Sequence, residues 1–356
     1  MSHSADFFLG ASGPNGFRSY FERSFTAEDG WRVLIIKGGP GTGKSTLMKR
    51  ICSEAEKREL DYERIWCSSD PSSLDAVIVP GLRCAIFDGT PPHVLEPRCP
   101  GVCESIVDLG AAWDESSLRA ASESIMRLST RCSEHHAQCA RFLACAEAFR
   151  RNTFLYADAA LDRQKITRMA DRIAHRILKK ERVRFKAPSE CVRLLSAVTP
   201  NGVRFAGEPV CGCMIRVSDN TGAAANELIG AVREKLREAK EPVVCCPCSQ
   251  NGDILEHLVI PERDILMTTC NELHAVEDDS RVIHAERFMN ACLCEEAKQR
   301  FSANSRARRE MIRLAVRELG CALSIHDELE QYYRDAMDFS AVDDIAARTL
   351  ERFFAE

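Results

Sequence analysis

The sequence predicts an α/β fold made of two similar units, each with a mostly parallel sheet and surrounding helices, together with helical extensions. Three observations predict this class. Near the start of the chain, a short apolar run is followed by a glycine-rich loop and an amphipathic helix. The same order of apolar runs and breakers recurs about 180 residues later. A long helical pattern closes each unit.

Composition narrows the class of protein. The 356 residues are enough for two domains with full cores, and 45% apolar with 28% charged residues is typical of soluble globular proteins. A net charge of −5 provides no basic field, which argues against a nucleic-acid partner. Since no apolar run reaches the ~20 residues that span a bilayer, and the first residues lack a signal-peptide pattern, we expect a cytoplasmic protein without a membrane partner.

The 18 cysteines are a high count, and in a cytosolic chain we expect free thiols. Three clusters need weighing: Cys211/Cys213, Cys245-Cys246-Pro247-Cys248 and Cys292/Cys294. The C-x-x-C spacing within the second cluster can hold zinc. The same stretch, "PVVCCPC", also fits a buried strand whose alternate side chains face opposite ways. Plain packing is our interpretation, with metal binding and redox chemistry as alternatives.

The glycine-rich loop follows Val33–Ile36, an expected buried strand, and precedes a helical pattern. It reads "GGPGTGKS" and fits G-x-x-x-x-G-K-[ST], the Walker A motif of P-loop proteins. Glycines let successive N–H groups converge on phosphate oxygens, and the helix N-terminus adds its positive dipole end. The residues expected to bind a nucleotide are Gly38, Gly39, Pro40, Gly41, Thr42, Gly43, Lys44, Ser45 and Thr46.

The motif assigns roles within this loop. Lys44 would reach the β- and γ-phosphates of ATP, and the Ser45 hydroxyl would bind Mg²⁺. A second metal acid is expected at the end of a neighbouring strand, and Asp88 follows the apolar run "CAIF" in the Walker B manner. Asp70 and Asp75 are the competitors. The motif leaves open whether the phosphate goes to water or to an acceptor.

The chain repeats itself. An offset of 181 lays residues 33–96 over 214–277 without a gap, with apolar runs and breakers coinciding. "GASGPNGF" resembles "SAVTPNGV", and an offset of 176 pairs Asp162 with Asp338 downstream. We therefore expect two units, a P-loop domain over residues 1–187 and a degenerate repeat over 188–356, joined near Lys186–Glu190.

The repeat also tests the site, because the second loop, "SDNTGAAAN", lacks the phosphate-binding residues. Gly38, Gly43, Lys44 and Ser45 fall on Asp219, Ala224, Ala225 and Asn226. Asp88 and Asp70 fall on Thr269 and Asn251, so the proposed metal acids disappear together with the lysine. Asp75 and His93 fall on Glu256 and His274. An acid and a histidine are thus kept in the second half although its phosphate-binding residues are lost. This favours a role in the fold for these two positions, with a role in the nucleotide site as the alternative.

Residues from about 113 to 185 have a helical pattern. Ile166, Met169, Ile173 and Ile177 form an apolar stripe, and Arg168, Arg172 and Arg176 form a basic row at i+4 spacing. A solvated face on a helix packed against its own domain is the simplest interpretation. A lid that delivers arginine to phosphates and a nucleic-acid surface are the alternatives. The helical segment that ends the chain could pack on this one.

The stretches "KGGPGTGKSTLMKR", "CSSDPSSLDAVIVPGLRCAIFDGTPPHV" and "HDELEQYYRDAMDF" resemble a little-characterised bacterial family of tandem P-loop ATPases. The resemblance covers nearly the whole chain and implies two P-loop-like halves. In that family the second half often keeps its own phosphate-binding loop. This sequence differs from the family there, because its second loop lacks the phosphate-binding residues. Nucleotide binding therefore carries over to Gly38–Thr46 only.

Three functions follow as hypotheses. The first is a Mg²⁺-dependent ATPase in which Lys44, Asp88 and Asp70 are catalytic, Ser45 and Asp88 hold the metal, and the second half regulates. The second is a phosphotransferase of the nucleotide-kinase type, with the helical segment as a lid. The third is an ATP-dependent switch with negligible turnover, whose protein partner the sequence does not identify.

Overall fold

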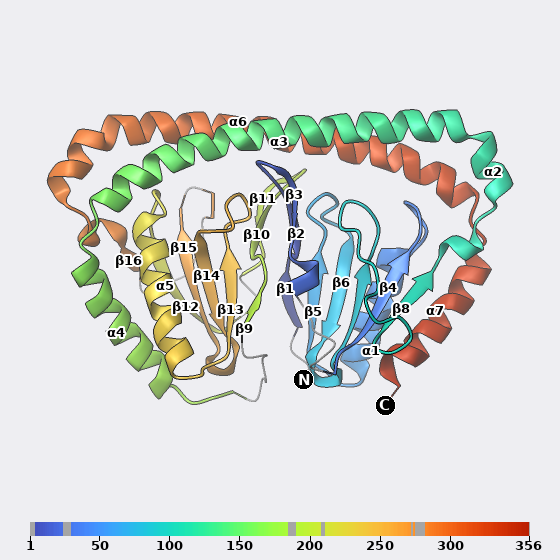
Figure 1. Ribbon diagram of the computed structural model, residues 1–356, viewed down its shortest axis with the longest axis horizontal. Coiled ribbons are helices and arrows are strands. Elements are labelled where there is room, and N and C mark those ends of the chain that lie inside the picture. The colour runs from blue at the N-terminus through green and yellow to red at the C-terminus, as the bar shows by residue number, and fades with distance from the viewer. Residues whose placement is uncertain are drawn as a thin grey trace.

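The computed structural model describes residues 4–23, 30–183, 190–207, 211–271, 273–274 and 282–355, without the side chains of 291–296. Two six-stranded sheets stand side by side beneath two long helices (Figure 1). The expected α/β class is confirmed, and the sheets are mixed, with parallel and antiparallel pairs. Most of the predicted junction, Lys186–Glu190, lies outside the described residues.

The first sheet has the strand order β1-β5-β6-β7-β4-β8. Its strands are β1 (Ser4–Phe7), β4 (Arg32–Lys37), β5 (Tyr62–Trp66), β6 (Leu74–Val79), β7 (Cys84–Asp88) and β8 (Glu104–Asp108). Strand β6 runs antiparallel to both neighbours, whereas β4 is parallel to β7 and β8. The four apolar residues Val33–Ile36 of β4 are buried, as expected for an interior strand covered on both faces.

The second sheet has the order β16-β12-β15-β14-β13-β9, which is the order of the first sheet with each strand replaced by its counterpart. Its strands are β9 (Glu190–Val192), β12 (Cys213–Ser218), β13 (Val243–Pro247), β14 (Leu255–Ile260), β15 (Ile265–Cys270) and β16 (Val282–His284). Strands β12, β13 and β14 begin 181 residues after β4, β5 and β6. The offset found in the sequence therefore relates equivalent strands.

The two halves meet between the sheets. Each half contributes a hairpin: β2 (Gly10–Gly13) with β3 (Gly16–Ser19), and β10 (Ser196–Thr199) with β11 (Gly202–Phe205). The backbones of Phe8 and Leu194 exchange two hydrogen bonds of 2.8 Å. Arg193 Nε forms a buried ion pair of 2.8 Å with Glu63. One apolar cluster contains residues of both halves, so the sheets share a core.

A helix follows the loop after the equivalent strand in each half: α1 (Lys44–Lys57) after β4 and α5 (Ala223–Glu238) after β12. Both bury an apolar face against their sheet, which explains the helical periodicity of the sequence. Short 3₁₀ turns complete the connections: η1 (Phe21–Arg23), η3 (Pro80–Leu82), η4 (Gly110–Ala112), η5 (Pro261–Arg263) and η6 (Ala285–Phe288).

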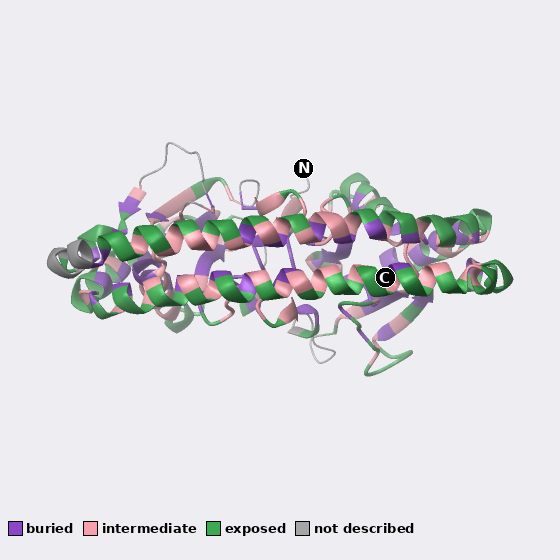
Figure 2. Ribbon diagram, turned by 90° about the horizontal axis from the view of Figure 1, so that it is seen from above, coloured by how far each residue is buried: buried purple, intermediate pink, exposed green. Residues whose placement is uncertain are grey.

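The remaining helices are α2 (Glu115–Ala120), α3 (Ser122–Ala159), α4 (Arg163–Lys179), α6 (Ala291–Asp335) and α7 (Phe339–Phe354). Helices α3 and α6 lie antiparallel and side by side above both sheets (Figure 2). Cys132 contacts the carbonyl of Ala322, and Asn152 hydrogen-bonds Asn304, so the start of each helix lies beside the end of the other. The expected packing between the two helical segments is therefore present.

Because α3 and α6 each span the molecule, the helices that follow them end on the opposite half. Helix α4 packs on α5 of the second half, and its predicted apolar stripe belongs to that core. Helix α7 packs on the core of the first half, where Asp343 pairs with Arg50 of α1 at 2.7 Å. Division of the chain at residue 187 does not anticipate this crossing. The basic row Arg168, Arg172 and Arg176 is exposed on α4.

Among the described residues, no helix combines the length and the apolar character that crossing a membrane requires.

Candidate functional site

The Walker A residues form a loop between β4 and α1. Gly41 has φ of 67° and Gly43 has φ of 91°, a left-handed conformation that side-chain-bearing residues rarely adopt. Thr42 is buried, and its hydroxyl donates to Gly39 O at 2.9 Å, which closes the loop on itself. Glycine is therefore required by the backbone at positions 41 and 43.

Lys44, the first residue of α1, lies over this loop. Its Nζ donates to Gly39 O at 2.7 Å and lies 3.7 Å from Asp88 Oδ2. Asp88 is the last residue of β7 and pairs with Ile36 of β4, so adjacent parallel strands place the two charges together. Thr90 donates to Asp88 Oδ1 from its backbone nitrogen at 2.9 Å, and this orients the carboxylate. The structure therefore places Lys44 next to Asp88, the two residues that the sequence assigned to the same site.

Ser45 joins the helix to the sheet. Its Oγ accepts a hydrogen bond of 3.1 Å from Leu74 N at the start of β6. In the second half, Asn226 Oδ1 accepts one of 2.9 Å from Leu255 N in the same way. The substitution of serine by asparagine keeps this tether, so position 45 has a role in the fold beside any role in metal binding.

Asp75 lies in the site as well, although sequence reasoning ranked it below Asp88 and Asp70. It is 4% exposed and lies opposite Asp88 on the antiparallel strand β6. His93 Nε2 is 3.7 Å from Asp75 Oδ1, and Asp75 Oδ2 has no hydrogen-bond partner. Burial raises the pKa of Asp75 to about 6; the charge of Asp88 adds to the rise, while those of His93 and Lys44 oppose it.

Asp70 has a different environment. Its Oδ1 accepts from Ser72 N at 3.0 Å and from Ser72 Oγ at 2.7 Å, and its Oδ2 accepts from Ser73 Oγ. Burial raises the pKa of Asp70, but these serine hydrogen bonds outweigh it and lower the pKa overall. The carboxylate caps its own turn, which accounts for an aspartate before Pro71 without invoking the metal.

The far end of α6 covers the loop. Glu330 Oε1 accepts a hydrogen bond of 3.2 Å from Gly41 N. The ring of Tyr333 lies against Gly39, where an added Cβ would come within 2.5 Å of the ring. Sequence reasoning missed both residues because they lie about 290 positions from the loop, as the 289-residue separation of Gly41 and Glu330 shows.

The second loop carries its own anion. Asp219, at the position of Gly38, is 3% exposed, and its carboxylate accepts from Thr221 N at 2.8 Å and Ala225 N at 3.0 Å. These amides belong to the loop and to the first turn of α5, where N–H groups lack partners within the helix. The Asp219 carboxylate thus accepts from backbone amides at the start of α5, and Ala225 is at the position equivalent to Lys44.

Replacement of Asp219 by alanine is expected to lower the free energy of unfolding by about 2 kcal/mol, because buried amides lose their acceptor. Urea denaturation of the variant measures this change. Asn220→Ala is the control, since Asn220 is exposed in the same loop. Equal denaturation midpoints for the two variants would show that the Asp219 carboxylate does not stabilise the loop.

A pocket of about 610 Å³ lies beside this second loop, lined by Asp219, Thr221, Arg150, Lys298 and Arg308 among others. It lies between the loop and the α3–α6 pair. Arg150 is engaged by Glu147 through two hydrogen bonds of 2.6 Å. The second half therefore has a cavity beside its loop, where two backbone amides already donate to Asp219.

The cysteine cluster at residues 245–248 fits packing in the core. Cys245, Cys246 and Cys248 are free and buried, and burial raises the pKa of Cys245 and of Cys248 to about 12. Cys211 and Cys213 are free and at least partly exposed. The side chains of Cys292 and Cys294 lie outside the described residues. Within the described part of the chain, the one group of three possible metal ligands contains none of these cysteines.

Comparison with family models, with curated proteins and with solved structures gives no match for this chain.

Proposed function

We propose that the first half binds ATP with Mg²⁺ at Gly38–Thr46 and hydrolyses it. The observation that carries the proposal is the contrast between the two loops. In the second half the Asp219 carboxylate accepts from two backbone amides, whereas the first loop has glycine at that position and a lysine at the helix start. Among the described residues, the only carboxylate that accepts from an amide of the first loop comes from α6, where Glu330 accepts from Gly41 N. A phosphate that displaced it would meet the loop amides and the helix start.

The surrounding side chains suit the same ligand. Lys44 Nζ now donates to Gly39 O and lies beside the Asp88 carboxylate. Lys44 would give up the bond to Gly39 O and donate to phosphate oxygens instead, while its positive charge stays next to Asp88. Ser45 and Asp88 are the residues proposed to hold Mg²⁺, which when bound would neutralise phosphate charge. Asp75 is better placed than Asp70 to accept the proton of the attacking water, because Asp75 Oδ2 is free whereas the Asp70 oxygens cap a turn.

The products formed from ATP–Mg²⁺, with and without a panel of nucleosides, test the reaction. Free phosphate without an acceptor supports hydrolysis. If ADP forms only when an acceptor is present, the protein is a phosphotransferase and the proposed hydrolysis is wrong. If ATP binds tightly and no product forms, the protein is an ATP-dependent switch. The Glu330–Gly41 hydrogen bond favours the switch as the second candidate, since a phosphate at the Gly41 amide would displace the α6 carboxylate.

Removal of the Glu330 carboxylate is expected to tighten ATP binding by about threefold to tenfold, because a charged hydrogen bond to Gly41 N no longer competes. Calorimetric titration of Glu330→Ala with ATP–Mg²⁺ measures the effect. Glu328→Ala is the matched control, since it removes the same charge from an exposed position two residues away. An equal gain in both variants would attribute the effect to net charge and not to the contact.

The hydrolysis rate is expected to fall as the pH falls through about 6, because Asp75 then becomes protonated. The charged groups that face it are His93, Asp88 and Lys44. Stability should respond in the opposite direction. A carboxyl whose folded pKa is raised stabilises the fold at low pH, and this contribution is lost as the pH rises through about 6.

Asp75→Asn is expected to reduce the rate about 10²- to 10⁴-fold and to remove the acidic limb of the pH profile. The paired variant is Asp70→Asn, which should keep the limb. If Asp70→Asn removes the limb and Asp75→Asn retains it, the roles of the two acids are reversed.

A further inference from the structure

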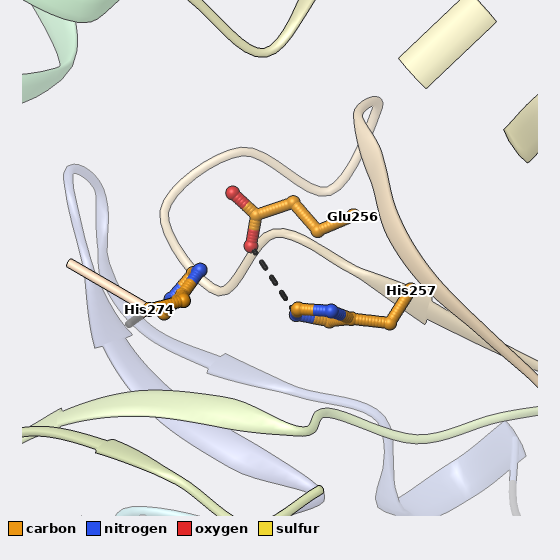
Figure 3. A group of neighbouring side chains, drawn as sticks. All are labelled: Glu256, His257 and His274. Atoms are coloured by element: carbon orange, nitrogen blue, oxygen red, sulfur yellow. Dashed lines mark ion pairs between the residues drawn. The ribbon is translucent and has the colours of Figure 1, made fainter. Parts of the chain in front are cut away.

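Three buried side chains converge in the second half, on and after the strands β14 and β15. Glu256 and His257 are consecutive residues of β14, and His274 follows β15. One ligand atom from each lies within 4.8 Å of the other two, and Glu256 Oε2 is 3.9 Å from His257 Nε2 (Figure 3). The residues are 7%, 0% and 6% exposed, in the order Glu256, His257 and His274.

The polar atoms at this point lack partners. Glu256 Oε2, His257 Nε2 and His274 Nδ1 are buried without a hydrogen bond. Such atoms are rare in folded proteins, because each loses its hydrogen bonds to water without gaining one within the protein. Three of them facing one another form a set of electron-pair donors around a common space, and a bound cation would satisfy all three at once.

The neighbouring residues favour this arrangement. His257 Nδ1 lies 2.8 Å from Thr268 Oγ1, and donation of the Nδ1 proton to that oxygen leaves the Nε2 lone pair directed at the cluster. The Phe205 ring lies 5.3 Å from the His257 ring and forms an apolar wall.

We propose that Glu256, His257 and His274 bind a transition metal ion, with Zn²⁺ as the best match and with the fourth position open. Two imidazoles and one carboxylate are a ligand set of open zinc sites. Ligands at about 2.0–2.1 Å from zinc lie roughly 3.3 Å apart in a tetrahedron, so small side-chain rotations would close the present spacing. The oxygen ligands that Mg²⁺ prefers are too few here.

The first half offers a natural comparison. The positions of Glu256, His257 and His274 correspond there to Asp75, Ala76 and His93. One imidazole is missing, so the first half has two of the three ligands beside its Walker A loop. The metal site is thus specific to the second half, and it is distinct from the Mg²⁺ position proposed at Ser45 and Asp88.

A charged neighbour must be accounted for. The charges of Arg308 and Arg150 act on Glu256, so the carboxylate is not electrostatically isolated. An arginine could balance its charge without any metal. This alternative does not account for the histidines, because His257 Nε2 and His274 Nδ1 accept no hydrogen bond from either arginine.

Cobalt titration of the chelator-treated full-length protein tests the site. Co²⁺ should produce visible absorption typical of tetrahedral coordination, without the near-ultraviolet band of thiolate ligands, and Zn²⁺ should displace it. This readout separates the site from the 18 cysteines of the chain. A thiolate band, or no visible absorption, would overturn the assignment.

Glu256→Gln keeps the shape of the side chain, and His257→Ala introduces the residue of the first half. Each is expected to weaken Co²⁺ binding at least tenfold. His175→Ala on α4 is the control, because His175 is exposed and distant in sequence. Circular dichroism checks that the variants fold. If His257→Ala does not fold, the near-isosteric Glu256→Gln variant alone tests the metal site. Unchanged Co²⁺ affinity in folded Glu256→Gln would refute the proposal.

Discussion

Lys44→Ala is expected to weaken ATP–Mg²⁺ binding at least a hundredfold and to abolish hydrolysis. Lys44 Nζ is the cation that the loop presents at the helix start, and Asp88 lies 3.7 Å away. Without the amine, the phosphates would meet this carboxylate with no positive charge between them. Calorimetric titration with ATP–Mg²⁺ measures the loss directly.

The control for this variant is Lys57→Ala, which removes the same charge from an exposed position at the other end of α1. The Lys57 variant should bind ATP as the unaltered protein does. If Lys44→Ala also binds ATP with unchanged affinity, the proposed nucleotide site is wrong in each of its versions, whether hydrolase, phosphotransferase or switch.

Phe353→Ala is expected to lower the free energy of unfolding by about 3–5 kcal/mol. Phe353 belongs to α7, near the end of the chain, and is 0% exposed in the core of the first sheet. The cavity would open beside α1, so ATP binding should weaken together with stability. Chemical denaturation, with and without ATP–Mg²⁺, measures both effects.

Phe339→Ala serves as the comparison, since Phe339 starts the same helix and is 45% exposed. Its cost should stay within about 1 kcal/mol. Equal costs for the two phenylalanines would mean that α7 does not pack on the first half as described.

Short-range chemistry made part of this structure predictable. The glycine-rich segment was expected between a strand and a helix, and it does lie between β4 and α1, because glycines interrupt regular structure locally. The 181-residue offset identifies equivalent strands, since breakers and apolar runs are local properties. Asp88 was predicted because it ends an apolar run, and the structure places it at the end of β7, beside β4.

Other features depend on contacts between distant parts of the chain. An apolar stripe shows that α4 has a face to bury, but not which sheet it covers. Glu330 looks like any helix-surface acid until the fold brings it to Gly41. Asp219 was recognised as the loss of a glycine, whereas its carboxylate fills the space of the missing ligand. Asp75 was ranked low because Glu256 keeps an acid at the equivalent position, and survival of an acid does not distinguish its possible roles.

The crossing of α3 and α6 has a consequence for how the protein can be divided. Helix α4 follows α3 of the first half and covers the second sheet, whereas α7 follows α6 of the second half and covers the first sheet. The arrangement resembles a domain-swapped dimer whose two chains have been joined. A fragment that ends at residue 187 would carry α4, which covers the other sheet, and would lack α7, which covers its own. We therefore expect a fragment that ends at residue 187 to leave the core of its own sheet without the cover of α7.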